Sequence, residues 1–339
     1  MNILITGATG FIGRNLIYWL KNVHETDYKV SCLVRGDKFS TDFDKFLKKY
    51  GIKATRVKGD LKIPSSLSKA IAIARPDLVI HMAALTPVRN SWRYLKEYME
   101  VNYFGTVNLI NAIHSSKKFR YAKLIYYSTM EVLKPYNSLD EFMRKAPTDP
   151  EDVPVYPSTP YAASKLAAEG YVKTQPYVDA CIVRPCNTFD RSIMGMNPES
   201  MGYFVEKAVT TLLMGRRPKF DGLPDRVRTW MHVSDHIKAL LNIIHGKWDH
   251  GKIFHIAPED TTLSCGTMYH NILSVMENDY KIYDYQRNPL WGLKPRPYDP
   301  PVLAMKGGNV PSWKPEGLMM RLRETVDLWH SVLGDAKKV

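Results

Sequence analysis

Three glycines near the start of the chain, Gly7, Gly10 and Gly13, could bind a phosphate group through the backbone. They follow a short apolar run, Asn2–Ile5, and an amphipathic segment, Phe11–Leu20, begins among them. This order predicts a buried strand, a tight turn and the start of a helix. Bare glycines let a pyrophosphate approach backbone N–H groups, where the helix dipole favours negative charge. The same spacing also occurs in ordinary turns, but its place between a strand and a helix favours a dinucleotide site.

The end of the second expected strand, Tyr28–Val34, bears on which dinucleotide binds. A carboxylate at that point binds the ribose 2′-hydroxyl of NAD, whereas an arginine nearby accommodates the 2′-phosphate of NADP. This chain has Val34 followed by Arg35. We therefore favour NADP as the cofactor and keep NAD as the alternative, since a solvated loop arginine would look the same in sequence.

Small and polar residues also follow the next two expected strands. Strand Ala54–Val57 is followed by Gly59 and Asp60, and Asp60 could contact an adenine or simply make a turn. Strand Asp77–His81 is followed by the small residues 82–84, which leave room for a ligand in the crevice at the strand ends.

Tyr161 and Lys165 lie four residues apart at the start of an expected helix over 161–174, so they share one face. Without further context such a pair is usually a surface pair. The preceding stretch, 133–160, has six prolines and neither a helical nor a strand period. We expect it to be a functional or mobile loop.

The other expected elements alternate between helix and strand, which predicts an α/β fold with a Rossmann-like doubly wound parallel sheet and a smaller α/β C-terminal part. A dinucleotide-binding domain is expected over residues 1–185, with 229–256 returning to it, and a second domain over 186–335. The remaining elements are expected at 92–115 (a long amphipathic helix carrying Asn102), 123–128, 180–183, 204–214, a helix ending near 245, 252–256 and 317–333.

Composition limits the classes of function. The chain has 339 residues, 45% of them hydrophobic, and a net charge of +13. The basic residues are scattered and their two modest clusters, 45–58 and 117–123, lack a nucleic-acid-binding pattern, so we expect no nucleic-acid partner. No apolar run reaches the roughly 18 residues that would span a bilayer, so no membrane partner is expected.

The four cysteines, Cys32, Cys181, Cys186 and Cys265, have neither CxxC nor metal-ligand spacing. Free thiols in a reducing cytoplasm are the preferred interpretation, and no metal site is expected. The first residues lack the features of a signal peptide and are expected to be part of the fold.

Several motifs in order resemble the extended short-chain dehydrogenase/reductase superfamily, and specifically its nucleotide-sugar epimerase/dehydratase branch. The resemblance extends over nearly the whole chain. The motifs are Gly7–Gly13, His81-x-Ala-Ala84, Asn102–Thr106, Ser128-Thr129, Tyr161-x-x-x-Lys165, Arg184–Asn187, Arg228 before Val233-Ser-Asp235, Arg296–Asp299 and Trp313–Leu318.

The resemblance implies catalysis through transient oxidation of the sugar at C4. Tyr161 would take the proton of the 4-hydroxyl, Lys165 would lower the pKa of Tyr161, and Thr129 would hydrogen-bond the same oxygen. Glu131 would remove the C5 proton in a hexose 4,6-dehydratase.

The resemblance also implies binding residues, here for a nucleoside diphosphate sugar and its cofactor. Those expected at the cofactor are Gly7, Thr9, Gly10, Phe11, Ile12, Gly13, Arg35, Asp60, Leu61, Ala83, Ala84, Asn102, Tyr161, Lys165 and Pro185. Those expected at the substrate are Thr86, Thr129, Asn187, Arg228 and Arg296, with the two arginines clamping the diphosphate.

The choice of reaction stays open at this point. Thr129 and Glu131 favour a hexose 4,6-dehydratase, but Met130 stands where many of these enzymes carry an aspartic acid for the leaving hydroxyl. A nucleotide-sugar 4-epimerase, which needs no acid there, is the alternative. A 4-keto reductase or a UDP-glucuronate decarboxylase is less favoured. The family's usual Asn-x-Tyr-Gly-Pro is replaced by residues 187–191, which leaves the local substrate loop unassigned.

The sequence disfavours two other classes of function, a non-catalytic NADP-binding sensor and a nucleic-acid binder. A sensor has no need of the set Thr129, Tyr161 and Lys165, and only net charge suggests nucleic acid. In relatives, helices corresponding to 92–115 and 161–174 form a four-helix bundle between subunits, so the resemblance implies a homodimer.

Overall fold

The computed structural model describes residues 1–22, 28–36, 40–116, 118–119, 121–190, 193, 203–280, 289–292 and 299–336. Its main feature is a seven-stranded sheet with the order β3-β2-β1-β4-β5-β6-β9, in which every neighbouring pair is parallel. The strands are β1 (Asn2–Thr6), β2 (Lys29–Val34), β3 (Thr55–Lys58), β4 (Leu78–His81), β5 (Lys123–Tyr127), β6 (Ala180–Pro185) and β9 (Ile253–Ile256). The predicted doubly wound parallel sheet is confirmed.

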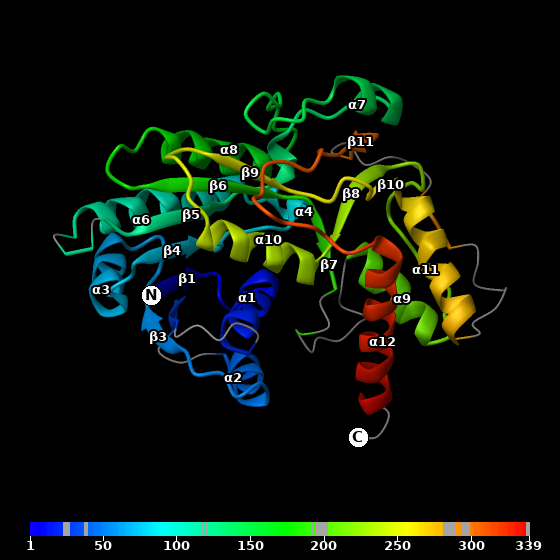
Figure 1. Cartoon of the computed structure of the whole chain (residues 1–339), viewed down its shortest axis with the longest axis horizontal. Helices are drawn as coiled ribbons and strands as arrows, with labels where there is room; N and C mark the ends of the chain where they lie inside the picture. The colour runs from blue at the N-terminus through cyan, green and yellow to red at the C-terminus, as the bar shows by residue number, and fades with distance from the viewer. Residues whose placement is uncertain are drawn as a thin grey trace.

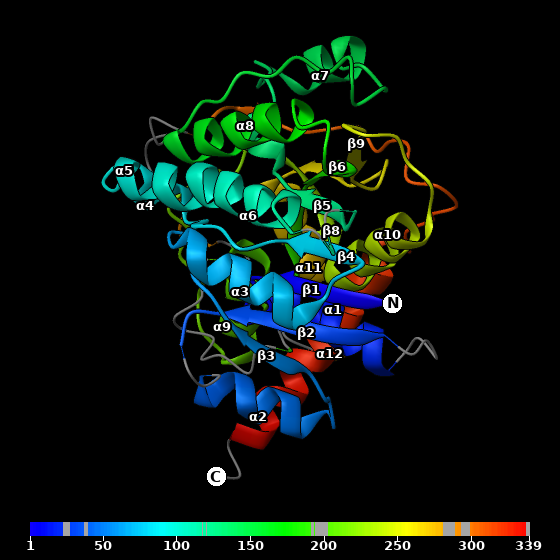
Figure 2. The ribbon, with the colours of Figure 1, turned by 90° about the vertical axis from the view of Figure 1, so that its left-hand side faces the viewer.

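Helices cover both faces of this sheet (Figures 1 and 2). One face carries α1 (Phe11–Asn22), α2 (Thr41–Lys49) and α10 (Val233–His245), and the other carries α3 (Pro64–Ala74), α6 (Gly105–His114) and α8 (Pro160–Lys173). Ile3 and Ile5 belong to the first hydrophobic core and Leu4 to the second, because successive strand residues point to opposite faces. A strand buried on both faces explains the continuous apolar run in the sequence.

The strand order reverses between β1 and β4, where chain connections leave the sheet in opposite directions. Ligands of open α/β sheets bind in the crevice at the carboxyl ends of the strands near such a switch point. The glycine turn at residues 7–10 follows β1 and therefore lies at this crevice.

A smaller sheet contains four strands, β7 (Asn187–Phe189), β8 (Val227–His232), β10 (Thr262–Ser264) and β11 (Val302–Leu303). Side chains of this small sheet form a separate hydrophobic core with three helices, α9 (Phe204–Leu213), α11 (Cys265–Tyr280) and α12 (Leu318–Ala336). Residues 233–256 form α10 and β9 against the main sheet, whereas 227–232 lie in the small sheet.

Two expected elements differ from the structure. The predicted continuous helix 92–115 is divided into α4 (Val88–Ser91), α5 (Leu95–Tyr98), a π-helical segment (Met99–Phe104) and α6. The predicted loop 133–160 contains a helix, α7 (Leu139–Lys145), which Ser138 caps by accepting a hydrogen bond from Glu141 N. Helix α7 is too short to show a hydrophobic period in the sequence. Phe142 and the capping residue Ala146 share a hydrophobic cluster with Val227 and Val302, which are far along the chain.

Among the described residues, no helix combines the length and the apolar composition needed to cross a bilayer. The four cysteines are free thiols, and three of them are buried.

A buried ion pair joins α10 to α12. Arg321 Nε donates to Asp235 Oδ2 at 2.8 Å and Arg321 Nη2 donates to Asp235 Oδ1 at 2.7 Å. Trp313 Nε1 also donates to the Asp235 carbonyl at 3.0 Å. The C-terminal helix is therefore tied to a helix of the main sheet by a two-pronged charged contact.

We expect Arg321→Met to lower the free energy of unfolding by about 3–5 kcal/mol, because it leaves the Asp235 carboxylate buried beside an uncharged side chain. Urea denaturation followed by circular dichroism measures this. The matched control is Arg323→Met, which removes the exposed partner of Asp279 on the same helix and should cost at most about 1 kcal/mol. Equal losses in the two variants would contradict the assignment.

Candidate active site

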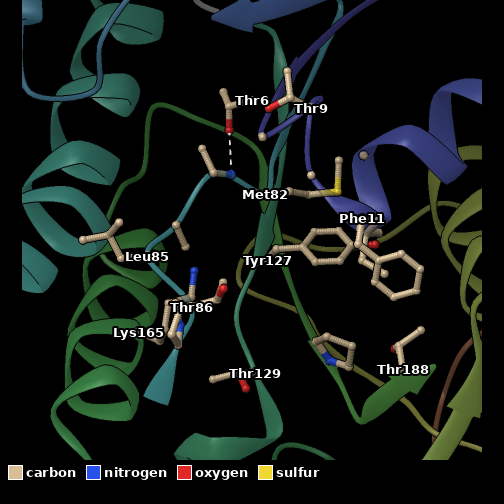
Figure 3. A pocket seen from close by; sticks show the side chains of 18 of the residues that line it. Thr6, Thr9, Phe11, Met82, Leu85, Thr86, Tyr127, Thr129, Lys165 and Thr188 are labelled. Carbon is tan, nitrogen blue, oxygen red and sulfur yellow. Dashed lines mark hydrogen bonds between the residues drawn. The ribbon is translucent and has the colours of Figure 1, made fainter. Parts of the chain in front are cut away.

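A cavity of about 1030 Å³ opens at the carboxyl ends of β1, β2, β4, β5 and β6 (Figure 3). It extends from the glycine turn and the end of β2 to the start of α8 and the first strand of the small sheet. The expected residues that line it are Gly7, Thr9, Gly10, Phe11, Ile12, Gly13, Arg35, Asp60, Leu61, Ala83, Ala84, Thr86, Thr129, Glu131, Tyr161, Lys165, Pro185 and Asn187. One cavity thus collects most of the residues that the sequence singled out.

The glycines have different roles. Gly7 has φ +73°, and a Cβ there would lie 2.7 Å from Ala83 N. A Cβ at Gly13 would lie 2.4 Å from Gly7 O, so both positions need glycine for packing. A Cβ at Gly10 would have, among the described atoms, only Gly7 O within 4 Å, so its other side faces open space in the cavity. This bare backbone, at the N-terminus of α1, fits a dinucleotide pyrophosphate.

The far end of the cavity, beyond the glycine turn, is lined by the end of β2 and the turn after β3. Arg35 is exposed there, with Ser40 and Lys62 in the same lining. Asp60 also lines the cavity, while its Oδ1 accepts a hydrogen bond from Lys62 N at 2.9 Å. Asp60 therefore stabilises its own turn as well as facing the cavity. Two cationic side chains, Arg35 and Lys62, lie at this end of the cavity.

Asn102 lies behind the cavity wall. Its Oδ1 accepts from Leu85 N at 2.8 Å, and its Nδ2 donates to Leu85 O at 3.1 Å and to Ser164 Oγ at 3.0 Å. It is 1% exposed and does not belong to the cavity lining. The expected cofactor contact of Asn102 is therefore indirect: it fixes the loop after β4 and the helix that carries Lys165.

Tyr161 and Lys165 share the inner face of α8. Thr159 caps the start of this helix, and its Oγ1 accepts a hydrogen bond from Ala162 N at 3.1 Å. Burial raises the pKa of Tyr161 well above its usual value near 10. A hydrogen bond with Thr129 opposes this rise, and the negative charge of Glu131 adds to it. The Thr129 hydroxyl and the Glu131 carboxyl therefore both influence the Tyr161 phenol in the cavity.

Lys165 is buried, with Nζ 4.4 Å from the centre of the Tyr126 ring. Burial lowers the pKa of Lys165 to about 7, and the negative charge of Glu169 raises it. Glu169 itself forms a buried ion pair with Arg184, with Nη2 and Oε2 2.6 Å apart. Lys165 is thus an amine whose charge is easily changed by a ligand.

Glu131 is half-buried in the cavity wall, and its backbone N donates to Thr129 Oγ1 at 3.2 Å. Burial raises the pKa of the Glu131 carboxyl, Arg228 lowers it and Asp299 raises it. A carboxyl group with a raised pKa near a phenol is suited to proton transfer.

Of the two arginines expected to clamp the diphosphate, Arg228 is the one that the structure describes. Arg228 lies outside the cavity lining; its Nη1 donates to Val227 O at 2.6 Å and to Pro300 O at 3.2 Å, and its Nη2 pairs with Asp299. The second expected clamp residue, Arg296, lies outside the described residues.

Asn187 lines the cavity, and its Nδ2 contacts the Met130 sulfur at 3.7 Å. Met130 is 2% exposed. The position between Thr129 and Glu131 therefore presents a thioether, which donates no proton.

The lining also includes residues to which the sequence assigned no role, among them Tyr127, Ser128, Thr188 and His236. Ser128 Oγ is buried and has no hydrogen-bond partner within the described part of the chain. A ligand in the cavity could hydrogen-bond Ser128 Oγ. The position of Ser128 next to Thr129 was the feature of the sequence that could have indicated this. His236 comes from α10, and nothing in its local sequence relates it to β5 or β7.

Comparison with known proteins agrees with this geometry. The model of the NAD dependent epimerase/dehydratase family matches residues 3–257. The dTDP-glucose 4,6-dehydratase of Mycobacterium tuberculosis is 27% identical over 292 residues, covering 84% of this chain and 80% of that protein. The human dTDP-D-glucose 4,6-dehydratase is 28% identical over 262 residues, covering 75% and 68%.

Solved structures share the fold. A UDP-glucose 4-epimerase from Thermotoga maritima, with UDP-glucose, has a TM-score of 0.76 at 21% identity and covers 98% of this chain and 100% of that one. A dTDP-glucose 4,6-dehydratase from Streptomyces venezuelae, with NAD bound, has a TM-score of 0.77 at 23% identity and covers 98% of both chains. With its glycine turn, its Thr129, Tyr161 and Lys165 in one cavity and a family match over residues 3–257, the chain belongs to the NAD-dependent epimerase/dehydratase family.

Proposed function

We propose that the protein is a hexose 4,6-dehydratase that acts on a nucleoside diphosphate sugar with a nicotinamide cofactor. The observation that carries this proposal is Glu131, which lies in the same cavity as Thr129 and Tyr161 and whose charge acts on the Tyr161 phenol. A 4-epimerase has no use for a carboxyl base at this point, whereas a dehydratase needs one for the C5 proton. The similarity to named 4,6-dehydratases supports the same choice.

In this mechanism, Thr129 and Tyr161 hold the sugar 4-hydroxyl, and Tyr161 accepts its proton. A nicotinamide held along the cavity by the glycine turn and Lys165 would supply the redox chemistry, as acceptor of the C4 hydride and its donor to C6. The new 4-ketone acidifies the C5–H bond, so Glu131 removes that proton and passes it to the C6 hydroxyl, which leaves as water. C5 then takes a proton from solvent as C6 is reduced. Lys165 favours the charged form of Tyr161 when it is itself protonated.

A nucleotide-sugar 4-epimerase is the second candidate. Met130 favours it, because a buried thioether cannot protonate a departing C6 hydroxyl. Incubation in D₂O with GDP-mannose, dTDP-glucose, CDP-glucose, UDP-glucose, UDP-N-acetylglucosamine and UDP-glucuronate separates the two. A product that has lost water and gained deuterium at C5 supports the dehydratase, whereas an isomer of unchanged mass without deuterium supports the epimerase.

We expect Glu131→Gln to lower the dehydration rate by about 10²–10⁴-fold, because the amide cannot accept the C5 proton. Reduction of the cofactor on mixing with sugar should persist, since C4 oxidation does not use Glu131; absorbance of the reduced nicotinamide measures it. Because burial raises the Glu131 pKa, the rate of the natural enzyme should fall as pH drops through that raised value. Glu141→Gln, on the exposed helix α7, is the control. Full turnover by Glu131→Gln would remove the proposed base.

We infer a preference for NADP over NAD from Arg35 at the end of β2, with Lys62 in the same lining. Arg35→Ala should weaken NADPH binding by about 10–100-fold, the effect of one charged hydrogen-bonding partner, and change NADH binding little. Fluorescence titration of each reduced cofactor measures this, with Arg144→Ala on α7 as the control. Tighter binding of NADH than NADPH by the natural protein would refute the preference.

A homodimer is proposed through the outer face formed by α4–α6 and α8, which lie side by side in Figure 2. Trp92, Leu95 and Phe104 expose large apolar side chains there, with 52–55% of each accessible. Phe104→Lys should convert the protein from about twice the chain mass to the single-chain mass of 38.9 kDa in sedimentation equilibrium. Met143→Lys, an equally exposed position on α7, should leave the dimer intact. A natural protein that sediments as a monomer would rule the proposal out.

A cytoplasmic location is proposed because free thiols persist in reducing compartments. Fractionation of cells that make the protein tests it, and recovery outside the cytoplasmic fraction would contradict it.

A further inference from the structure

Three side chains form a hydrogen-bonded chain along one wall of the cavity. Tyr127, at the end of β5, lies with its hydroxyl 3.1 Å from His236 Nε2. The other ring nitrogen, Nδ1, lies 2.9 Å from Thr188 Oγ1 on β7. All three residues line the cavity, and the proposed mechanism uses none of them.

The chain is uncharged. His236 is 1% exposed, and burial lowers its pKa to about 3, so the imidazole is neutral near pH 7. A neutral imidazole donates from one nitrogen and accepts at the other. Burial also keeps the Tyr127 phenol protonated by raising its pKa.

The contacts allow an arrangement in which every proton is used. Thr188 Oγ1 lies 3.3 Å from the carbonyl of Cys186 and can donate to it. His236 Nδ1 then donates to Thr188, and Nε2 accepts from Tyr127. The rings of His236 and Tyr127 also stack, with centroids 5.8 Å apart and planes 12° from parallel. Lone pairs on Tyr127 and Thr188 remain available to a ligand.

The wall lies between the phosphate-binding turn and the catalytic group. Phe11, the first residue of α1, lines the same cavity, and Figure 3 shows its ring beside that of Tyr127. Thr129 follows Tyr127 by two residues at the end of β5 and faces the same space. A dinucleotide that reaches from Gly10 to Tyr161 would occupy the cavity that this wall lines.

We propose that His236 is a positioning residue for the cofactor: it holds Tyr127 and Thr188 as a preformed polar wall for the redox end of the dinucleotide. The inference rests on the proposed function only in that the cavity takes a nicotinamide dinucleotide; it does not depend on which sugar reaction follows. Side chains already fixed by hydrogen bonds lose no further conformational entropy when the cofactor binds, so the cofactor binds more tightly. His236 contacts β5 of the main sheet and β7 of the small sheet at once, so its loss frees both sides.

The test is the dissociation constant of NADPH and NADH, measured by fluorescence titration without sugar, together with urea unfolding of the cofactor-free protein. His236→Phe keeps an aromatic ring but breaks both hydrogen bonds, and we expect it to raise the dissociation constant of the preferred cofactor about 10-fold. Tyr127→Phe and Thr188→Val, which are nearly isosteric, should each raise it about 3-fold.

The matched control is His245→Phe on the same helix. His245 hydrogen-bonds Tyr28, so it makes the same kind of contact, but it lies outside the cavity lining. His245 is exposed, so this variant should change stability little and keep its cofactor affinity. If His236→Phe loses stability but also keeps its cofactor affinity, His236 is only structural and the inference is overturned.

If His236→Phe does not fold, Tyr127→Phe and Thr188→Val decide: unchanged affinity in both overturns the inference, and weaker binding in both supports it. A natural protein that binds neither NADPH nor NADH would overturn the proposed function and this inference together. If the natural protein binds the cofactor and the variants bind it more weakly, both the proposed function and the role of His236 are supported.

Discussion

The buried hydrogen-bond chain from Thr6 to Asn102 is the constraint on which the cavity depends. Thr6 Oγ1 lies 2.7 Å from His81 Nδ1, His81 Nε2 lies 3.0 Å from Thr106 Oγ1, and Thr106 donates to the Asn102 carbonyl at 2.7 Å. Burial lowers the His81 pKa to about 3, so the chain adds no charge to the core. Asn102 then holds Ser164, the residue before Lys165. Two strands and two helices are thereby fixed around one ligand space, and in this low-dielectric interior a missing member would leave its neighbours unpaired at high cost.

Sequence reasoning succeeded where chemistry follows from local order. Gly7 could be placed because a glycine after a buried strand lies at the sheet's carboxyl edge, and Tyr161 and Lys165 because residues four apart share a helix face. It could not foresee partners that are remote in the chain. Arg228 pairs with Asp299, and no spacing rule brings Asp299 beside it. Helix α7 was missed because it is short and gains its stability from contacts with β8 and β11.

Burial acts in opposite directions on the pKa values of Tyr161 and Lys165. It raises the pKa of Tyr161 and lowers that of Lys165, so both groups are driven toward their neutral forms. A cationic ligand beside the phenol would favour its ionised form, as would protonation of Lys165. The negative charge of Glu131 opposes that ionisation, so the phenol and the carboxyl are not both favoured in their charged forms.

The π-helical segment Met99–Phe104 has a consequence for how this site can change. A π-turn closes its hydrogen bond one residue later than an α-turn, so the helix beyond it is rotated by about 100° relative to an unbroken helix. Asn102 faces inward within this offset. Replacing side chains leaves the number of residues in the turn unchanged, whereas losing a single residue between α5 and α6 would let an ordinary α-turn close there and remove the offset. The inward amide is therefore a property of chain length in this stretch, and insertions or deletions are the changes that it tolerates least.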